Sequence, residues 1–205
     1  PIFGPQSGWF LGYDEMRHLE LRPGDRTRSP LYVTFRCDLP ENVAAHSFGV
    51  VYTTLLLAEL VERPIDLAAA LALAALHDLP EALTTDIPTP AWRFLPGGSK
   101  TDAERQAMTQ IVGEGPVGAR WLAWWEEMRL NESAEAQLVH DADRLDLYLQ
   151  AHIYELHTGN RQLEEFWRVV HRFFYPQAQA IYDELRRRRG AGDRGDVAAL
   201  NTEHA

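Results

Sequence analysis

Cysteine occurs once among the 205 residues, at Cys37, so the chain cannot form a disulfide within itself. Chains without disulfides are typical of reducing compartments, and we therefore expect a cytoplasmic protein. No apolar run reaches the roughly 18 residues of a membrane-spanning helix, and the N-terminus lacks the pattern of a signal peptide. These absences predict a protein that does not act in a membrane.

Basic residues are also in the minority: 20 Lys and Arg stand against 30 Asp and Glu, which gives a formal net charge of −10. Broad binding to nucleic-acid polymers requires a basic surface that displaces counterions, so we expect no such partner. A small anionic substrate remains compatible, because a metal ion or a few arginines can reverse the charge locally. Nineteen of the basic residues are Arg, which coding bias explains at least as well as function does.

Several sequence patterns are missing as well. There is no glycine-rich phosphate loop, Gly-x-Ser-x-Gly elbow, paired Cys-x-x-Cys or internal repeat. Only residues 31–35 are strand-like, and one isolated strand cannot make a sheet. Apolar residues at helical spacing predict an all-α protein with a single bundle of six or more helices over residues 41–189. An irregular lead-in, residues 1–40, would pack on this domain, and residues 190–205 would form a flexible tail.

The expected helices begin and end at recognisable signals. Pro40 and the acidic Glu41 favour a helix start, and Asp66 is a plausible N-cap of a helix over residues 67–76. Pro176 is expected to kink or split the last helix. Further helical patterns cover residues 102–112, 135–157 and 162–189, and the second of these carries an apolar stripe of Leu138, Leu145 and Leu149.

One junction concentrates ionisable groups. The apolar run at residues 67–76 leads directly into the sequence HDLPE at residues 77–81, and a proline-rich loop with Asp86 follows. Burying a charge costs free energy unless the charge is paired or bound to a metal ion. A buried helix has no stability reason to end on so many ionisable groups, so we predict that this junction is the active site.

Other predicted helices offer further ligands. His46 follows Val43 by three residues and precedes Val50 by four, which places it on the inward face of its helix. A hydrogen-bonded core histidine is the competing interpretation of this residue alone. The candidate metal ligands are therefore His46, His77, Asp78 and a carboxylate from residues 141–146.

This donor set suits one divalent ion, of which Mn²⁺, Co²⁺, Zn²⁺ and Fe²⁺ are all candidates. Such an ion can lower the pKa of a bound water to roughly 7 and can polarise a phosphoryl oxygen. Adjacent His77 and Asp78 do not face the same side of a regular helix, so they can share an ion only if it lies between their side chains. Asp141 and Asp143 lie on opposite helix faces, and the apolar stripe does not decide between them.

The order His46, His77-Asp78, Asp143 resembles the HD-domain metal-dependent phosphohydrolases, whose ligand pattern is H…HD…D. The resemblance covers about residues 41–155. Residues 41–47, ENVAAHS, are similar to the family's E-[NS]-V-[AS]-E-H-S. Residues 77–90 are similar to the H-D-x-x-E-x-x-T-G-D-[IL]-P-T-P stretch of the family's 5′-deoxynucleotidase branch.

The resemblance implies one divalent metal ion bound by His46, His77, Asp78 and Asp143, since the family's Ala-Asp before an apolar run favours Asp143 over Asp141. It implies that Glu81 orients water or relays protons. It also implies a catalytic role for Asp86, which would lie at the phosphate and sugar end of the pocket and help to position substrate or water. Expected substrate contacts are Tyr32, Arg36, Asp86 and Thr89. The chain departs from the family pattern at Ala45, Thr85 and Trp92, which leaves the ligand set intact.

The activity implied by the resemblance is removal of the 5′-phosphate from deoxynucleoside monophosphates by attack of metal-bound water. An HD-domain phosphodiesterase or guanosine tetraphosphate hydrolase is one alternative, although the latter usually carries H-D-x-x-E-D and this chain has Ala82 at the last position. A non-catalytic helical module that binds metal or nucleotides is another. The implied partner is a small nucleotide, and a homodimer is plausible.

Overall fold

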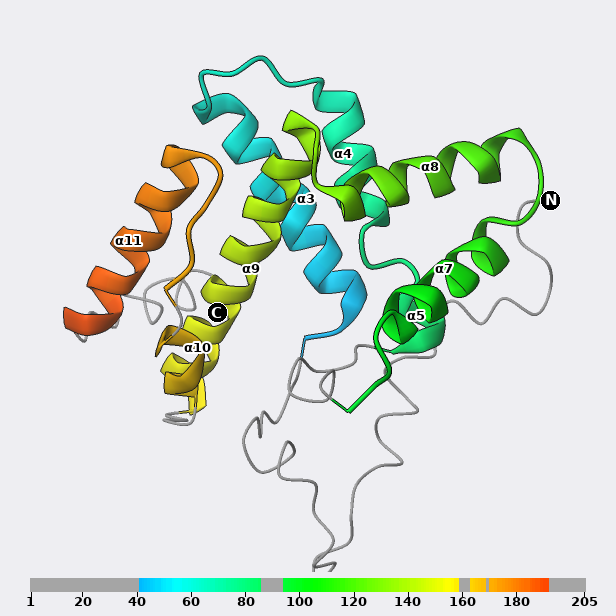
Figure 1. Ribbon diagram of the computed structural model, residues 1–205. Helices are drawn as coiled ribbons and strands as arrows, with labels where there is room; N and C mark the ends of the chain where they lie inside the picture. The colour runs from blue at the N-terminus through cyan, green and yellow to red at the C-terminus, as the bar shows by residue number, and fades with distance from the viewer. Residues whose placement is uncertain (1–40, 86–93, 159–162, 169, 192–205) are drawn as a thin grey trace, which may run out of the picture.

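The computed structural model describes residues 41–85, 94–158, 163–168 and 170–191, and within these ranges the secondary structure is helical without strands (Figure 1). The predicted all-α fold is therefore confirmed. Six helices of the described ranges have ten or more residues: α3 (Val43–Leu60), α4 (Leu67–Leu76), α7 (Ser99–Val112), α8 (Pro116–Leu130), α9 (Ala134–Thr158) and α11 (Pro176–Ala191). Two are shorter: α5 (Glu81–Thr84) and α10 (Glu164–Arg168). The expected strand-like run at residues 31–35 lies outside the described residues.

Side-chain caps and proline set the helix ends. Asn42 begins α3, where its side-chain Oδ1 accepts a hydrogen bond from the Ala45 N–H at 2.9 Å. Asp66 caps α4 by accepting from the Ala69 N–H at 3.1 Å, as its position in the sequence predicts. Pro176 is the first residue of α11, where a missing N–H costs no helical hydrogen bond. The predicted last helix is thus split, with a break between α10 and α11.

The helices pack around α9, which crosses the middle of the domain with α3 and α4 against it and α11 along its other side (Figure 1). Fully buried alanines of α4, Ala70 and Ala74, let that helix approach closely. A second, smaller cluster of Leu76, Met108 and Trp125 joins the end of α4 to α7 and α8. The main core contains Val50, Leu57, Leu73, Leu138, Leu145, Tyr148 and Tyr182.

The apolar stripe of α9 differs from the prediction at one position. Leu138 and Leu145 are buried, but Leu149 is 38% exposed, and Tyr148 takes the inward position instead at 1% exposure. The ring of Tyr148 lies 4.7 Å from that of Tyr182 on α11 and 5.1 Å from that of Trp167 on α10. Tyr148 therefore packs toward the C-terminal helices, and this contact decides which face of α9 is buried.

Asp141 of α9 ties the segment before α11 to the core. Its side chain is fully buried, and its two carboxylate oxygens accept hydrogen bonds from the backbone N–H groups of Phe174 at 3.0 Å and Tyr175 at 2.8 Å. The Tyr175 hydroxyl in turn donates to the carbonyl of Ala134 at 2.9 Å. Asp141 thus satisfies the buried N–H of Tyr175 and the part-buried N–H of Phe174.

We expect Asp141→Ala to destabilise the domain, because two backbone N–H groups would lose their acceptor. An unsatisfied buried donor costs about 1–3 kcal/mol, so the free energy of unfolding should fall by about 2–5 kcal/mol. Urea denaturation followed by circular dichroism measures the change. Glu59→Ala, which removes an exposed carboxylate of α3, is the matched control and should stay close to wild type. An Asp141→Ala midpoint equal to that of the control would contradict this role.

Two helical stretches, Val43–Leu60 and Leu67–Thr84, have the length and composition of membrane spans, although the sequence analysis expected none. Core helices of globular domains pass the same test. Both stretches contribute residues to the main core, and α3 also carries His46, a polar residue that faces other ionisable groups. Absence of membrane binding and a cytoplasmic location stay predictions.

Candidate metal centre

Four side chains from distant parts of the sequence meet where α3, α4 and α9 come together. His46 Nε2 in the first turns of α3 lies 3.1 Å from Asp143 Oδ1 of α9 and 3.4 Å from Asp78 Oδ2. His77 Nε2 lies 3.2 Å from the same Asp78 oxygen and 3.4 Å from His46 Nε2. The structure therefore brings His46, His77, Asp78 and Asp143 to one point.

His77 and Asp78 lie at the end of α4. The helix ends at Leu76, and its C-cap His77 keeps helical dihedral angles of φ −56° and ψ −45°. The two neighbouring side chains therefore leave the backbone in different directions, as on a regular helix, and they meet where Asp78 Oδ2 approaches His77 Nε2 at 3.2 Å. The Trp125 indole N–H of α8 donates to the His77 carbonyl at 3.2 Å and fixes this turn against α8.

Hydrogen bonds at the Nδ1 atoms of His46 and His77 determine which ring nitrogen of each residue carries the proton. His77 Nδ1 lies 2.8 Å from the Ala74 carbonyl, which can only accept, so this nitrogen carries the proton. His46 Nδ1 lies 2.8 Å from Asp146 Oδ2 and donates to that carboxylate in the same way. In the neutral rings both Nε2 lone pairs then face the centre. The two Nε2 atoms lie 3.4 Å apart, so their lone pairs repel each other unless a proton or a cation lies beside them.

The pKa shifts of the clustered groups also indicate that a positive charge is stabilised at this point. Burial disfavours a charged ring at His46, but hydrogen bonds to Asp143 and Asp146 outweigh it and raise its pKa to about 11. The pKa of His77 is also raised, since its bond to Asp78 outweighs burial. The pKa of Asp78 is lowered, because His77, His46 and Lys100 together outweigh its burial. The carboxylates thus attract positive charge to this point.

The donor set fits a divalent ion. One atom each from His46, His77 and Asp143 lies within 4.8 Å of the others, and Asp78 contacts both histidines. Two imidazole nitrogens with carboxylate oxygens suit borderline divalent metals. The arrangement explains why Asp143, and not Asp141, belongs to the candidate ligand set, since Asp141 is engaged by backbone donors on the opposite face of α9.

Asp146 holds His46 from the side away from the centre, a role that the sequence did not predict for it. It lies three residues after Asp143 on α9, so the two carboxylates share a helix face, and that spacing was the signal available in the sequence. A Cβ on Gly49 of α3 would collide with the Asp146 carboxylate. The missing side chain at Gly49 therefore leaves the space in which Asp146 reaches His46.

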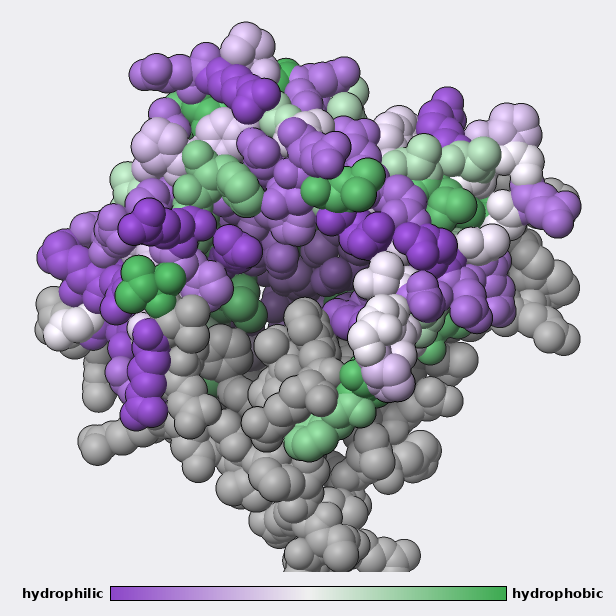
Figure 2. Space-filling view, viewed as in Figure 1, coloured by the Kyte–Doolittle hydropathy of each residue, from purple (hydrophilic) through white to green (hydrophobic). Residues whose placement is uncertain are grey.

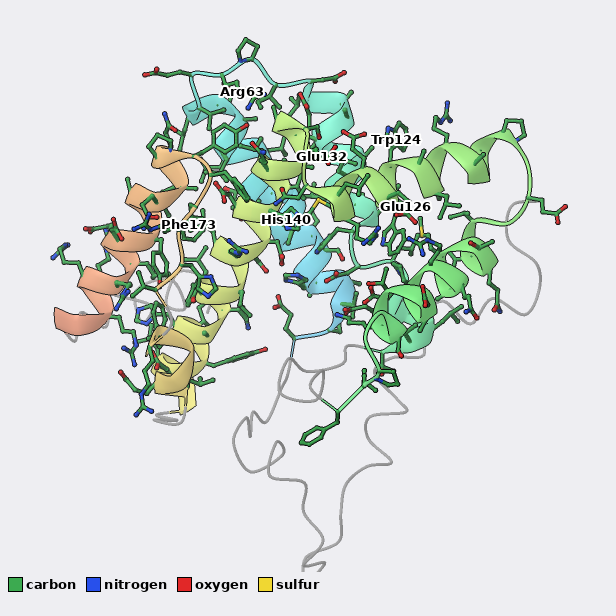
Figure 3. The ribbon with its side chains drawn as sticks, in the orientation of Figure 1. Arg63, Trp124, Glu126, Glu132, His140 and Phe173 are labelled. Carbon is green, nitrogen blue, oxygen red and sulfur yellow. The ribbon has the colours of Figure 1, made fainter. Side chains whose placement is uncertain are left out.

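A cavity of about 510 Å³ opens beside the ligand cluster. Figure 2 shows the middle of this face hollowed and lined mainly by hydrophilic residues. His140 of α9, labelled in Figure 3, lines it, and its Nε2 donates a hydrogen bond to the Met128 carbonyl at 3.0 Å. The volume lies within the range of small-molecule sites, roughly 300–1,000 Å³. Its described lining comes from the end of α4, from residues 95–104, and from α8 and α9.

Of the other predicted site residues, the structure describes Glu81 but not the substrate contacts. Glu81 begins α5 with a side chain that is only 10% exposed, 3.9 Å from Lys100, which lines the cavity. The predicted substrate contacts Tyr32, Arg36, Asp86 and Thr89 lie outside the described residues, so their roles stay predictions.

Known proteins resemble this chain over most of its length. A family model described as the HD domain matches residues 30–182. The 5′-deoxynucleotidase HDDC2 of Danio rerio is 30% identical over 154 residues, which make up 73% of this chain and 74% of the relative. The Homo sapiens protein of the same name is 29% identical over 168 residues, 80% of this chain and 78% of the relative.

Two solved structures are also similar to this chain in sequence and fold. A Pyrococcus horikoshii protein is 40% identical with a TM-score of 0.58, over 66% of this chain and 75% of that chain. A conserved hypothetical protein from Pyrococcus furiosus is 36% identical with a TM-score of 0.63, over 73% and 86%. Because the family model covers most of the folded body and the relatives match it over most of their own length, the chain belongs to the HD-domain family.

Proposed function

We propose that this chain is a metal-dependent phosphomonoesterase that removes the 5′-phosphate from deoxynucleoside monophosphates. The observation that carries the proposal is the convergence of His46, His77, Asp78 and Asp143 at the edge of a cavity of small-molecule size. Membership of the HD-domain family supports a hydrolase, and the similarity to the 5′-deoxynucleotidases HDDC2 of Danio rerio and Homo sapiens supports 5′-deoxynucleotides as the substrate class.

The four side chains would hold a single divalent ion, with Mn²⁺, Co²⁺, Zn²⁺ and Fe²⁺ as candidates. Such an ion lowers the pKa of water and polarises a phosphoryl oxygen. His77 is held in the required tautomer by the Ala74 carbonyl, and His46 is held by Asp146. These bonds fix the rings so that no reorientation is needed when the ion binds.

Glu81 would supply the proton-transfer group. Its backbone N–H donates to the Asp78 carbonyl at 3.0 Å, and its side chain lies 3.9 Å from Lys100 of the cavity wall, but it is not among the residues whose donor atoms converge. A carboxylate in this position can accept a proton from the attacking water and pass it toward the leaving 5′-oxygen. Asp86 would help to position the substrate at the phosphate and sugar end, as the resemblance implies.

Phosphate release from matched nucleotides tests the proposal. Metal-depleted protein is supplied with Mn²⁺, Co²⁺, Zn²⁺ or Fe²⁺ and given 5′- and 3′-monophosphates of deoxy- and ribonucleosides. We expect phosphate to be released faster from the 5′-monophosphates of deoxynucleosides than from the other monophosphates. A His77→Ala/Asp78→Ala double variant, purified identically, controls for contaminating phosphatases. A nucleotide diester and guanosine tetraphosphate are assayed in parallel by chromatography of their products. Cleavage of only these compounds would replace the monoesterase assignment, and metal binding without any turnover would leave a binding module.

Replacing Asp146 should weaken metal binding without removing a ligand. Asp146→Asn keeps the shape of the side chain but lets either an oxygen or an amide group face His46 Nδ1, so the ring is no longer held in one tautomer. Loss of such an outer partner typically costs 10–100-fold in metal affinity. We expect a decrease of about tenfold in Mn²⁺ affinity, measured by calorimetric titration of the metal-depleted protein.

Gly49→Ala is a second route to the same change, because the added Cβ would displace the Asp146 carboxylate from His46 without altering its charge. Asp183→Ala, on the exposed face of α11, is the matched acidic control and should bind Mn²⁺ as the wild type does. Unchanged Mn²⁺ affinity in both Asp146→Asn and Gly49→Ala would show that the His46–Asp146 bond is unimportant for the ion. The possible homodimer is a separate prediction, which light scattering of the purified protein addresses.

A further inference from the structure

One histidine in the cavity wall is not part of the candidate metal centre. His140 of α9 lines the cavity, as the candidate ligands His77 and Asp143 do, but its nitrogens are not among the donor atoms that converge in the described part of the chain. The ring is half-buried and precedes Asp143 by three residues (Figure 3). Residues at this spacing share a helix face, so His140 lies beside the ligand cluster and borders the same open space.

The hydrogen bond of His140 to α8 fixes its tautomer. Nε2 lies 3.0 Å from the Met128 carbonyl, which can only accept, so Nε2 carries the proton. Burial lowers the pKa of the ring and outweighs the opposing effect of this bond, so the ring is neutral at neutral pH. A neutral imidazole has one N–H, and Nδ1 therefore has a lone pair that accepts a hydrogen bond.

No described residue donates to this lone pair, since the hydrogen bond of the His140 ring is the one to Met128. Buried side-chain atoms without a partner do occur in the described ranges, but they belong to Thr54, Asn131, His152 and Trp167. His140 Nδ1 is thus unpaired but not buried, and the open space that its ring lines is the cavity. The cavity wall therefore presents a hydrogen-bond acceptor to the molecule that the cavity holds.

The lone pair determines which part of a nucleotide fits beside His140. Phosphate oxygens are themselves acceptors and would be repelled, whereas a hydroxyl or N–H group can donate. The phosphate would lie at the metal centre with Asp143, and three residues of helix separate His140 from Asp143 by about 4.5 Å along the axis. The sugar is the part of a nucleotide next to the phosphate. In a deoxynucleoside 5′-monophosphate the 3′-hydroxyl is the only hydroxyl of the sugar.

We propose that His140 accepts a hydrogen bond at Nδ1 from the 3′-hydroxyl of the deoxyribose and thereby positions the sugar while the phosphate lies at the metal centre. This inference rests on the proposed phosphomonoesterase function and adds a substrate-binding residue to it. The Met128 carbonyl holds the ring in the tautomer that the contact needs. The ring neither gains nor loses a proton when the sugar binds.

A substrate without the 3′-hydroxyl tests the proposal. The ratio kcat/KM is measured with Mn²⁺-loaded protein for thymidine 5′-monophosphate and for 3′-deoxythymidine 5′-monophosphate, which differ in this group alone. We expect the wild type to prefer the first compound by at least about fivefold, as one neutral hydrogen bond allows. In His140→Gln the amide can still donate to Met128 but does not occupy the place of Nδ1, so the preference should fall within about twofold. A wild-type protein without the preference would overturn the proposal.

Two further variants show whether the effect arises at Nδ1. His140→Asn can place its amide oxygen near the position of Nδ1 and should keep a preference of at least about threefold. His152→Gln makes the same exchange on α9 at a residue that is not part of the described cavity lining, and it should keep the wild-type preference. Loss of the preference in His152→Gln as well would overturn the proposal. If His140→Gln instead altered the choice between thymine and adenine substrates and left the effect of the 3′-hydroxyl unchanged, Nδ1 would face the base, and the proposal would also fail.

Binding measurements separate this inference from the proposed function. Equal hydrolysis of both thymidine compounds by the wild type would refute the role of His140 alone. If no monophosphate is cleaved, calorimetric titration of the Mn²⁺-loaded protein with the same two compounds makes the comparison. Binding that is at least about fivefold tighter with the 3′-hydroxyl, and equal in His140→Gln, would then refute the function alone. Absence of both turnover and binding would refute both.

Discussion

Asp143→Ala should remove the divalent ion and the phosphatase activity together. Asp143 Oδ1 lies 3.1 Å from His46 Nε2, whereas the other acidic residue of α9 at this place, Asp146, is bonded to the opposite ring nitrogen of His46, Nδ1. Loss of an outer partner costs 10–100-fold in metal affinity, and loss of a direct ligand should exceed that range. We expect a decrease of more than about 100-fold in Mn²⁺ affinity, with activity falling to background.

Metal content after dialysis, measured by inductively coupled plasma mass spectrometry, checks the first part, and phosphate release checks the second. Circular dichroism shows whether the variant is folded. Asp183→Ala is the control for removal of a carboxylate elsewhere on the surface. If Asp143→Ala retained one ion per chain with wild-type affinity, the candidate centre would not be the metal site.

Glu81→Gln should separate metal binding from turnover. The amide keeps the size of the side chain but cannot accept a proton at neutral pH, and general acid–base groups typically contribute 10²–10⁴-fold to rate. Since Glu81 is outside the converging donor set, the ion should remain bound. We expect kcat to fall by at least about 100-fold while Mn²⁺ affinity changes less than about threefold.

Steady-state kinetics with saturating Mn²⁺ and calorimetric titration of the same preparations make the comparison. Glu59→Gln, an exposed carboxylate of α3, is the control. A normal kcat in Glu81→Gln would remove this residue from the proton-transfer role. Loss of the ion together with activity would instead assign Glu81 to the ligand set.

Most of the fold could be predicted because its signals are local. Asp66 caps the helix that follows it, and Pro176 begins α11, and each depends on a few neighbouring residues. The inward face of α9 was predicted incorrectly at Leu149, because Tyr148 and Leu149 are both compatible with helical spacing after Leu145. The aromatic contacts of Tyr148 with α10 and α11 decide between them, and no local pattern shows those contacts.

In the candidate site, too, local signals could be predicted from the sequence and long-range contacts could not. The sequence pattern identified the four side chains that meet, and the resemblance favoured Asp143 over Asp141. Spacing alone could not make that choice, since it depends on Phe174 and Tyr175, more than thirty residues further along the chain. The role assigned to Asp146 also depends on a long-range contact, since Asp146 meets His46 across 100 positions.

Gly49 carries no functional group, yet its position restricts how this protein can evolve. A side chain at position 49 and a carboxylate at position 146 compete for the same volume between α3 and α9. Substitution at either position alone therefore passes through a form with a poorly held histidine, whereas paired exchange avoids it. Among homologous chains, a residue larger than glycine at position 49 should be accompanied by a shortened or repositioned side chain at position 146.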